Sequence, residues 1–349
     1  MTDRHDLLSN GSSEVQGLHR AGVLAAGLFI VDAVKTIDRW PEESALALIR
    51  SQSPANGGGA YNVLHNVGRL IPGHPRWAAG CIGDDELGEW IAADCLAAGI
   101  ETGLLRTHAT LGTSYTDVMS VAGAGSRTFF HSPGANVGFA PESAELTSVP
   151  AAVFYLGYLG LLPALDTLVG DQTAASRLLR DASRAGMVAV VDCVSVDRPD
   201  FAALALPSLR AADVFFCNEF EAGQILRRVV PCRWDAMQVA AEKLQQLSGA
   251  TVVVHTAIGA VHADELGVVI QPSVRVPIEQ IVGTNGAGDA FSAGYIVALE
   301  QEHPPATRLQ WGVAAAAASL ADATPSAGVR PIAECLAMAE RFGFVDLPL

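Results

Sequence analysis

The chain has 349 residues, half of them hydrophobic, and a formal net charge of −15. This composition supports a large buried core and excludes an intrinsically disordered protein. Nucleic acids and anionic membranes are bound mainly through lysine and arginine, so 22 basic residues against 37 acidic ones argue against both as partners.

Residues 1–20 are predicted to form a polar extension, because they lack the apolar stretch of a signal peptide. The six cysteines form no closely spaced pair, and most lie in apolar surroundings, which predicts buried free thiols and a cytoplasmic protein. The longest apolar stretch, residues 149–165, contains two prolines and two glycines. It is predicted to be a buried strand with its exit loop rather than a membrane span.

The first part of the chain mixes strands and helices. Residues 23–31 form an apolar run that ends at Asp32, which predicts a buried strand with an acid at its carboxyl end. Helices are predicted over 41–52, 60–70 and 84–98, with a glycine turn at residues 56–59. Alternating patterns predict a small separate sheet with strands over 102–106, 113–121 and 127–131 and a turn at 122–126.

From about residue 149, apolar strands alternate with helices. This pattern predicts a parallel sheet with helices on both faces. The strands are predicted over 151–156, 187–192, 213–218, 251–255 and 268–276. The helices are predicted over 166–184, 234–247, 288–300, 307–321 and 331–341.

The main chemical signal is the run Gly-Thr-Asn-Gly-Ala-Gly-Asp, which starts at Gly283. It follows a short predicted strand, 280–282, and enters a helix, so the amides of residues 286–288 would lie at the helix amino terminus. Free N–H groups and the helix dipole bind anions there. Asp289 could then accept a proton from a hydroxyl group that attacks a bound phosphoryl group, or it could only stabilise the helix start. A dinucleotide fingerprint fits less well, because it should open the first βαβ unit.

This run resembles the carboxyl-terminal signature of the ribokinase-like (PfkB) family of carbohydrate and nucleoside kinases. Five further motifs resemble family landmarks in the expected order: the strand ending at Asp32, Gly57–Asn62, Gly80–Gly88, Gly134–Asn136 and Asn218–Glu221. The resemblance covers residues 23–342 and implies a three-layer α/β/α domain over residues 21–349, with a central, mostly parallel sheet. It also implies a small β-sheet lid, expected from about residues 33–40 and 102–131.

The resemblance also implies roles for individual residues. Asp289 would be the general base, and the amides of Gly286, Ala287 and Gly288 would form the anion hole. The remaining expected ligands are Asp32, Gly57, Gly58, Asn62 and Asn136 for the sugar, Asn218, Thr256 and Gly259 for ATP, and Glu221, through water, for Mg²⁺. Exposed lid edges would allow a homodimer.

Three features depart from the family pattern. Gly283 stands where the family usually has Asp, which weakens the case for a monovalent-cation site. The nucleotide loop is degraded to His255–Gly259, and Gly59 stands where ribokinases often carry Lys, which favours an unphosphorylated sugar. The sequence therefore predicts an ATP-dependent carbohydrate kinase. A nucleoside kinase, a catalytically weak sugar- or nucleotide-binding regulator and, as an outside alternative, a nicotinamide oxidoreductase stay open.

Overall fold

The computed structural model describes residues 20–121 and 127–347. The predicted polar extension, apart from Arg20, and the predicted turn at 122–126 lie outside the described residues. The guanidinium of Arg20 donates to the carbonyl oxygens of Val149 (2.7 Å) and Ala151 (3.2 Å), so the described chain starts in contact with the domain.

The central sheet has nine strands in the order β15-β14-β13-β12-β11-β8-β1-β4-β5. The seven from β13 to β5 are parallel; they are β13 (Thr251–Thr256), β12 (Val214–Cys217), β11 (Val188–Cys193), β8 (Val153–Leu159), β1 (Val23–Gly27), β4 (Arg76–Gly83) and β5 (Glu101–His108). The antiparallel strands β14 (Gly259–Asp264) and β15 (Gly267–Pro272) complete one side. Since the parallel strands end at one edge, that edge is where an α/β sheet binds ligands.

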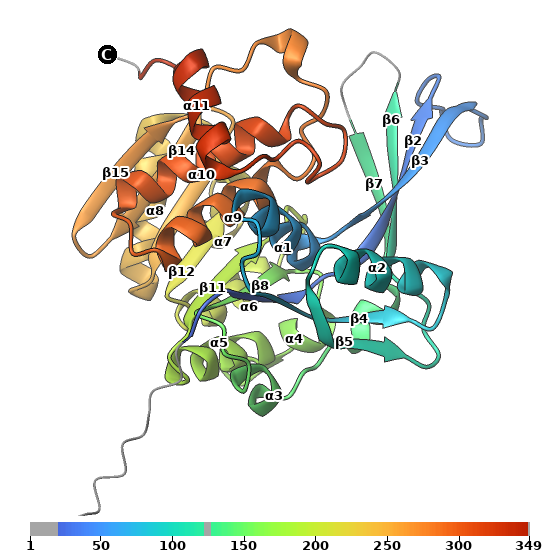
Figure 1. Ribbon diagram of the computed structural model, residues 1–349, viewed down its shortest axis with the longest axis horizontal. Helices are drawn as coiled ribbons and strands as arrows, with labels where there is room; N and C mark the ends of the chain where they lie inside the picture. Colours follow the sequence, from blue (N-terminus) through green and yellow to red (C-terminus); the bar gives the residue numbers. More distant parts are fainter. Residues whose placement is uncertain (1–19, 122–126, 348–349) are drawn as a thin grey trace, which may run out of the picture.

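Helices cover both faces of this sheet, as the sequence predicted (Figure 1). Alternate residues of β1 enter different cores: Leu24 and Ala26 belong to one buried cluster, Val23 and Ala25 to the other. The second cluster packs under α1 (Gly59–Leu70), α2 (Glu86–Ala97), α9 (Ala287–Glu300), α10 (Pro305–Ser319) and α11 (Ile332–Phe342). The first packs under α3 (Ser143–Thr147), α4 (Pro163–Asp166), α5 (Ala174–Arg184), α6 (Phe201–Leu209), α7 (Glu219–Leu226) and α8 (Trp234–Ser248).

The lid is a four-stranded sheet that projects from the body of the molecule (Figure 1). Its order is β3-β2-β6-β7, with β2 (Ile30–Ile37), β3 (Ile49–Gly57), β6 (Tyr115–Val121) and β7 (Arg127–Ser132). The predicted helix over 41–52 is wrong, because β3 pairs along β2 from Gly57 to Ile49. Residues 102–108 form β5 of the central sheet instead of a lid strand, since they pair with β4.

Other elements also differ from the prediction. The strand expected over 23–31 is divided into β1 and the start of β2, which belong to different sheets, so Asp32 lies within the lid strand β2 and not at the end of a central strand. The expected helix over 166–184 is divided by the hairpin of β9 (Leu168–Val169) and β10 (Gln172–Thr173), and the Thr173 hydroxyl then caps α5. The expected strand at 280–282 is absent; the short 3-10 helix η2 (Ile278–Gln280) precedes it. The strand expected over 268–276 ends at Pro272, and β14 before it was not predicted.

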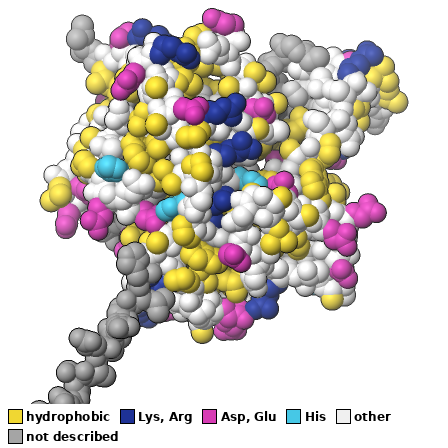
Figure 2. Space-filling model, viewed as in Figure 1, with side chains coloured by type: hydrophobic (Ala, Val, Ile, Leu, Met, Phe, Trp, Pro, Cys, Tyr) yellow, Lys and Arg dark blue, Asp and Glu magenta, His cyan; other side chains and the backbone are white. Residues whose placement is uncertain are grey.

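The surface and the cysteines agree with a domain that has a large core. All six cysteines are free, and five are buried. Among the described residues, no helix is long and apolar enough to cross a bilayer. On the face drawn in Figure 2, basic side chains lie among acidic and apolar ones.

Candidate active site

A cavity of 690 Å³ lies where the ends of the parallel strands meet the lid. Its wall combines segments that are far apart in the sequence. The body contributes Asn62, Tyr158, Asp192, Asn218, Glu221, His255 and Thr284–Asp289, and the lid contributes Ile30, Asp32, Thr116, Thr128, Phe129 and His131. The cavity therefore brings together most of the predicted site residues.

The run that the sequence singled out forms the amino terminus of α9 and the residues just before it. Gly286 precedes the helix with φ of 75°, and a Cβ there would lie 2.4 Å from Cβ of Pro325, so only glycine fits. The next backbone amides, those of Ala287 and Gly288, begin the helix beside the cavity. Free amides at a helix amino terminus can bind an anion.

Asp289 lies in the first turn of α9 and is only 5% exposed. Its Oδ2 accepts a hydrogen bond from Nδ2 of Asn62 (2.8 Å), and its Oδ1 accepts one from the Tyr158 hydroxyl. Burial raises the pKa of Asp289 to about 7, although these two donors act to lower it. A carboxyl group with a pKa near neutrality is suited to accept a proton from a hydroxyl.

Asp32 shares the cavity with Asp289 and lies beside the glycines at the end of β3. A Cβ on Gly57 would be 2.9 Å from Oδ2 of Asp32, so the loop packs directly on that carboxylate. Gly58 has φ of 99°, and a Cβ there would lie 2.4 Å from the carbonyl oxygen of Leu28. Asp32 and Gly58 line the cavity, while Gly57 supports Asp32 from behind.

Asn218 and Glu221 form a capping box at the start of α7. Oδ1 of Asn218 accepts from the Glu221 amide (2.9 Å), and Oε2 of Glu221 accepts from the Asn218 amide (2.8 Å). The Ser195 hydroxyl donates to Oε1 of Glu221 (2.9 Å). The pKa of Glu221 is raised to about 8, mainly by burial and secondly by the negative charge of Asp192. The helix-capping role is therefore present, and the same residues also line the cavity.

Besides Gly57, three other predicted ligands are not on the cavity wall. Asn136 is fully buried in the 3-10 helix η1 (Gly134–Gly138), where its Nδ2 donates to the carbonyl oxygen of Phe29 (3.2 Å). It thus braces the chain between β1 and β2. Thr256 and Gly259 lie at the β13–β14 turn, where the Thr256 hydroxyl accepts from the Ile258 amide (3.3 Å).

Among the cavity residues to which the sequence assigned no role, Tyr158, Asp192 and His255 have notable contacts. Tyr158 lies within an apolar run, so nothing in the pattern distinguishes it. Asp192 follows a run of apolar residues in the sequence, as Asp32 does, and that signal could have found it. Its carboxylate accepts from the Ser292 hydroxyl (3.1 Å), and burial raises its pKa to about 6. His255 stacks on Phe291 with ring centroids 5.1 Å apart, and burial lowers its pKa to about 4.

The departure at Gly283 also has a structural basis. A Cβ there would lie 3.0 Å from the carbonyl oxygen of Asp322 and 3.1 Å from Cα of Ala323. The Gly283 amide donates to the carbonyl oxygen of Leu320 (3.3 Å). The backbone after α10 therefore occupies the space that an aspartate side chain would need.

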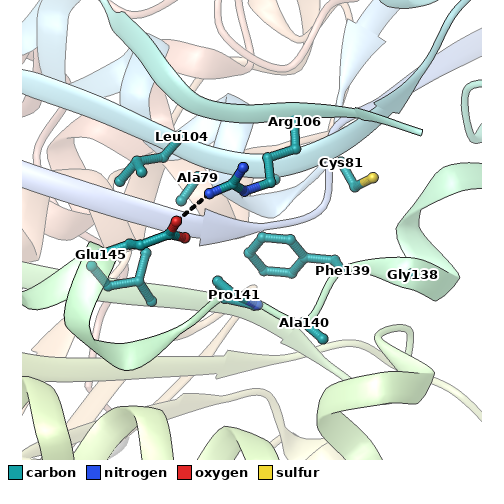
Figure 3. Close-up of a pocket in the computed structure, with 11 residues that line it drawn as sticks. Ala79, Cys81, Leu104, Arg106, Gly138, Phe139, Ala140, Pro141 and Glu145 are labelled. Atoms are coloured by element: carbon teal, nitrogen blue, oxygen red, sulfur yellow. Dashed lines mark hydrogen bonds and ion pairs between the residues drawn. The ribbon is translucent and has the colours of Figure 1, made fainter. Parts of the chain in front are cut away.

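A second pocket lies between β4, β5 and the segment before α3 (Figure 3). Phe139 and Cys81 wall it, and the Arg106 guanidinium pairs with the Glu145 carboxylate across it. Its volume of 60 Å³ is far below the roughly 300–1,000 Å³ of small-molecule sites. It is therefore too small for a sugar.

Comparison with known proteins agrees with this architecture. A family described as pfkB family carbohydrate kinase matches residues 21–330. An ATP-dependent ribose-1-phosphate kinase from Halopiger xanaduensis is 29% identical over 279 residues, which cover 78% of this chain and 83% of the relative.

Two solved structures show the same fold. Arabidopsis thaliana ribokinase, complexed with ribose and ATP, has a TM-score of 0.78 at 21% identity, covering 92% of this chain and 99% of the other. A Burkholderia thailandensis nucleoside kinase in complex with inosine has a TM-score of 0.74 at 17% identity, covering 92% and 98%. Both likenesses confirm the expected three-layer fold with a mostly parallel sheet.

Proposed function

The chain belongs to the pfkB family of carbohydrate kinases. From the family and from the lining of the cavity we propose that it transfers the γ-phosphoryl group of ATP to a hydroxyl group of a small, unphosphorylated, ribose-like sugar. One observation supports the proposal most strongly. A buried carboxylate, Asp289, directly follows the anion-binding amides of α9 and shares a cavity with Asp32.

Asp289 acts as the general base. It accepts the proton of the acceptor hydroxyl as that oxygen forms its bond to the γ-phosphorus, and the bond from phosphorus to the departing ADP oxygen breaks. The amides of Gly286, Ala287 and Gly288 stabilise the charge on the phosphoryl oxygens. A positioned base contributes about 10²–10⁴-fold to the rate, and each well-aimed donor contributes about 3–4 kcal/mol.

The sugar binds between the lid and the central sheet. Asp32 accepts hydrogen bonds from its hydroxyl groups, and Gly58 and Asn62 hold it from the other side. Asn136 acts indirectly, by holding the β1–β2 connection through Phe29. Among the described side chains of the wall, four are carboxylates and none is a lysine or arginine, which favours an uncharged acceptor over a sugar phosphate.

The residues present fit Mg²⁺ held mainly by phosphates and water. Among the described residues, no group of three or more acidic, histidine or cysteine side chains forms a metal cluster. Glu221 and Asp192 line the cavity and repel each other, and a divalent cation would relieve that repulsion. When bound, Mg²⁺ neutralises charge on the transferring phosphate. Asn218, Thr256 and Gly259 stay the proposed nucleotide contacts.

The lid is also the proposed surface for a homodimer. Trp40 stacks on Phe130 with ring centroids 6.2 Å apart, and both rings are half exposed. Leu46, Leu48 and Ile49 are exposed nearby on the same sheet and its loop. Sedimentation should show a dimer that Phe130→Asp dissociates; a monomeric wild type would contradict this.

ADP release tests the proposed function. Purified protein with ATP and Mg²⁺ is assayed against ribose, ribose 1-phosphate, hexoses, sugar acids and nucleosides. The proposal expects the highest kcat/KM for a free pentose or a close relative. Asp289→Asn keeps the shape of the base and should lower kcat by about 10²–10⁴-fold or more with little change in sugar binding.

Other outcomes identify the alternatives. Preference for ribose 1-phosphate would overturn the uncharged acceptor, and preference for adenosine would establish a nucleoside kinase. Thermal stabilisation by sugars or nucleotides without ADP release would indicate a binding regulator. Unchanged turnover in Asp289→Asn would remove the base assignment.

A further inference from the structure

The base is held by a tyrosine that has no place in the sequence motifs. The Tyr158 hydroxyl donates to Oδ1 of Asp289, and the carboxamide of Asn62 donates to Oδ2. These donors come from different elements, β8 and α1, so together they fix the plane of the carboxylate. Each carboxylate oxygen keeps a further lone pair, which can accept a hydrogen bond from the substrate hydroxyl.

The ring of Tyr158 reaches this position because residue 59 has no side chain. A Cβ on Gly59 would lie 2.7 Å from Cε1 and 2.8 Å from Cζ of Tyr158. Such contacts are far shorter than van der Waals contact, so any side chain at residue 59 would displace the ring. Gly59 and Tyr158 are therefore a coupled pair beside the catalytic carboxylate.

We propose that Tyr158 is a positioning residue for phosphoryl transfer, which orients Asp289 and keeps it ionised, and that Gly59 provides the space this requires. The inference rests on the proposed function of Asp289 as the base. Nothing in it requires the tyrosine to touch the substrate.

The surroundings make such a donor important. The titratable groups around Asp289 are Asp32 on β2, Tyr155 and Tyr158 on β8, Asp192 on β11, Glu221 on α7 and His255 on β13. Burial and the negative charges of Asp192 and Asp32 oppose ionisation of Asp289, whereas the Tyr158 and Asn62 donors favour it. Burial and the charge of Asp289 raise the pKa of Tyr158 well above its usual value, so the phenol stays a donor.

The test is the pH profile of kcat/KM for Tyr158→Phe, which removes the hydroxyl and keeps the ring. Because the donor stabilises ionised Asp289, its loss should move the acid limb upward by about one pH unit or more. Gly59→Ala retains the hydroxyl but displaces the ring, so it should move the same limb in the same direction. The double variant should shift no further than the larger single shift.

Tyr61→Phe is the matched control. Its hydroxyl also donates to an aspartate, Asp94, but this pair lies between α1 and α2, away from the cavity wall. The control should leave the acid limb in place. Circular dichroism and thermal unfolding show whether each variant is folded, and Gly59→Ala tests the pair independently if Tyr158→Phe does not fold.

Failure of this inference can be told apart from failure of the proposed function. A wild type that phosphorylates no acceptor contradicts the function, and the pKa of Asp289 is then read by ¹³C NMR of aspartate-labelled protein, assigned with Asp289→Asn. An active wild type whose acid limb, or whose Asp289 titration, is the same in Tyr158→Phe overturns the positioning role alone.

Discussion

Substitution of Gly286 by alanine tests whether the amino terminus of α9 must hold its present geometry. Gly286 has φ of 75°, and a Cβ there would lie 2.4 Å from Cβ, 2.6 Å from Cα and 2.8 Å from the carbonyl oxygen of Pro325. Two of these three atoms belong to the backbone. The alanine therefore meets both an unfavourable backbone conformation and a rigid neighbour.

The expected destabilisation follows from these two contributions. A left-handed alanine costs about 1–2 kcal/mol, and overpacking adds about 1–3 kcal/mol. The conformational restriction that alanine places on the unfolded chain offsets about 0.4–1 kcal/mol, which leaves a net loss of about 1–4.5 kcal/mol. With an unfolding entropy of about 2.1 cal/mol/K per residue, a chain of 349 residues should lose about 1.5–6 °C in Tm.

Activity should fall further than stability, because relief of the contact moves the amides and Asp289 together. A displacement of about 1 Å at a reacting centre costs about 10²-fold in rate. Gly170→Ala is the control: its φ is 67°, but nothing lies within 4 Å of the added Cβ. It should lose at most about 2 °C and no kcat. A Gly286→Ala protein with the stability and kcat of the wild type would refute this reasoning.

Three further outcomes are expected. Glu221→Gln should raise the Mg²⁺ concentration for half-maximal rate by about 10–100-fold, whereas Glu219→Gln, which lies outside the cavity wall, should not; equal Mg²⁺ titrations would contradict a metal role. In the folded protein the pKa values of Asp192, Asp289 and Glu221 are raised to about 6, 7 and 8, whereas in the unfolded chain these groups lose their protons nearer pH 4. Because the folded state therefore binds more protons, Tm should fall as the pH rises from 4 to 8, and it should fall less in Glu221→Gln. Rates in potassium and sodium salts of equal ionic strength should agree, because backbone atoms crowd Gly283; strong activation by potassium would show a cation site.

The fold was predictable where one segment carries its own periodic pattern. The helices predicted over 60–70, 234–247 and 288–300 correspond to α1, α8 and α9 within one or two residues. The helix predicted over 41–52 failed because residues 49–54 are exposed and their structure is decided by pairing with β2. Likewise, alternation in residues 102–106 predicted a strand, but only its pairing with β4 assigns it to the central sheet.

The site was predictable where polar residues follow apolar runs in the sequence or lie in the first turn of a helix. Asp32, Asn62, Glu221 and Asp289 come from four separate elements and line one cavity. Tyr158 could not be predicted, because its role depends on the absence of a side chain at Gly59, a hundred residues earlier. A contact between residues so far apart in the chain leaves no pattern in the sequence around either of them.

Two side chains of this site have both a structural role and a proposed chemical one. The Glu221 carboxylate that faces the cavity also closes the capping box of α7. If Glu221 is replaced, a loss of activity alone would therefore not show whether Mg²⁺ binding or the capping of α7 was lost. A selective change in Mg²⁺ dependence would show that metal binding was lost. The same holds for Tyr158, which both fills the space above Gly59 and donates to Asp289. Because phenylalanine fills that space equally well, a shifted pH profile in Tyr158→Phe reports on the hydrogen bond and not on packing.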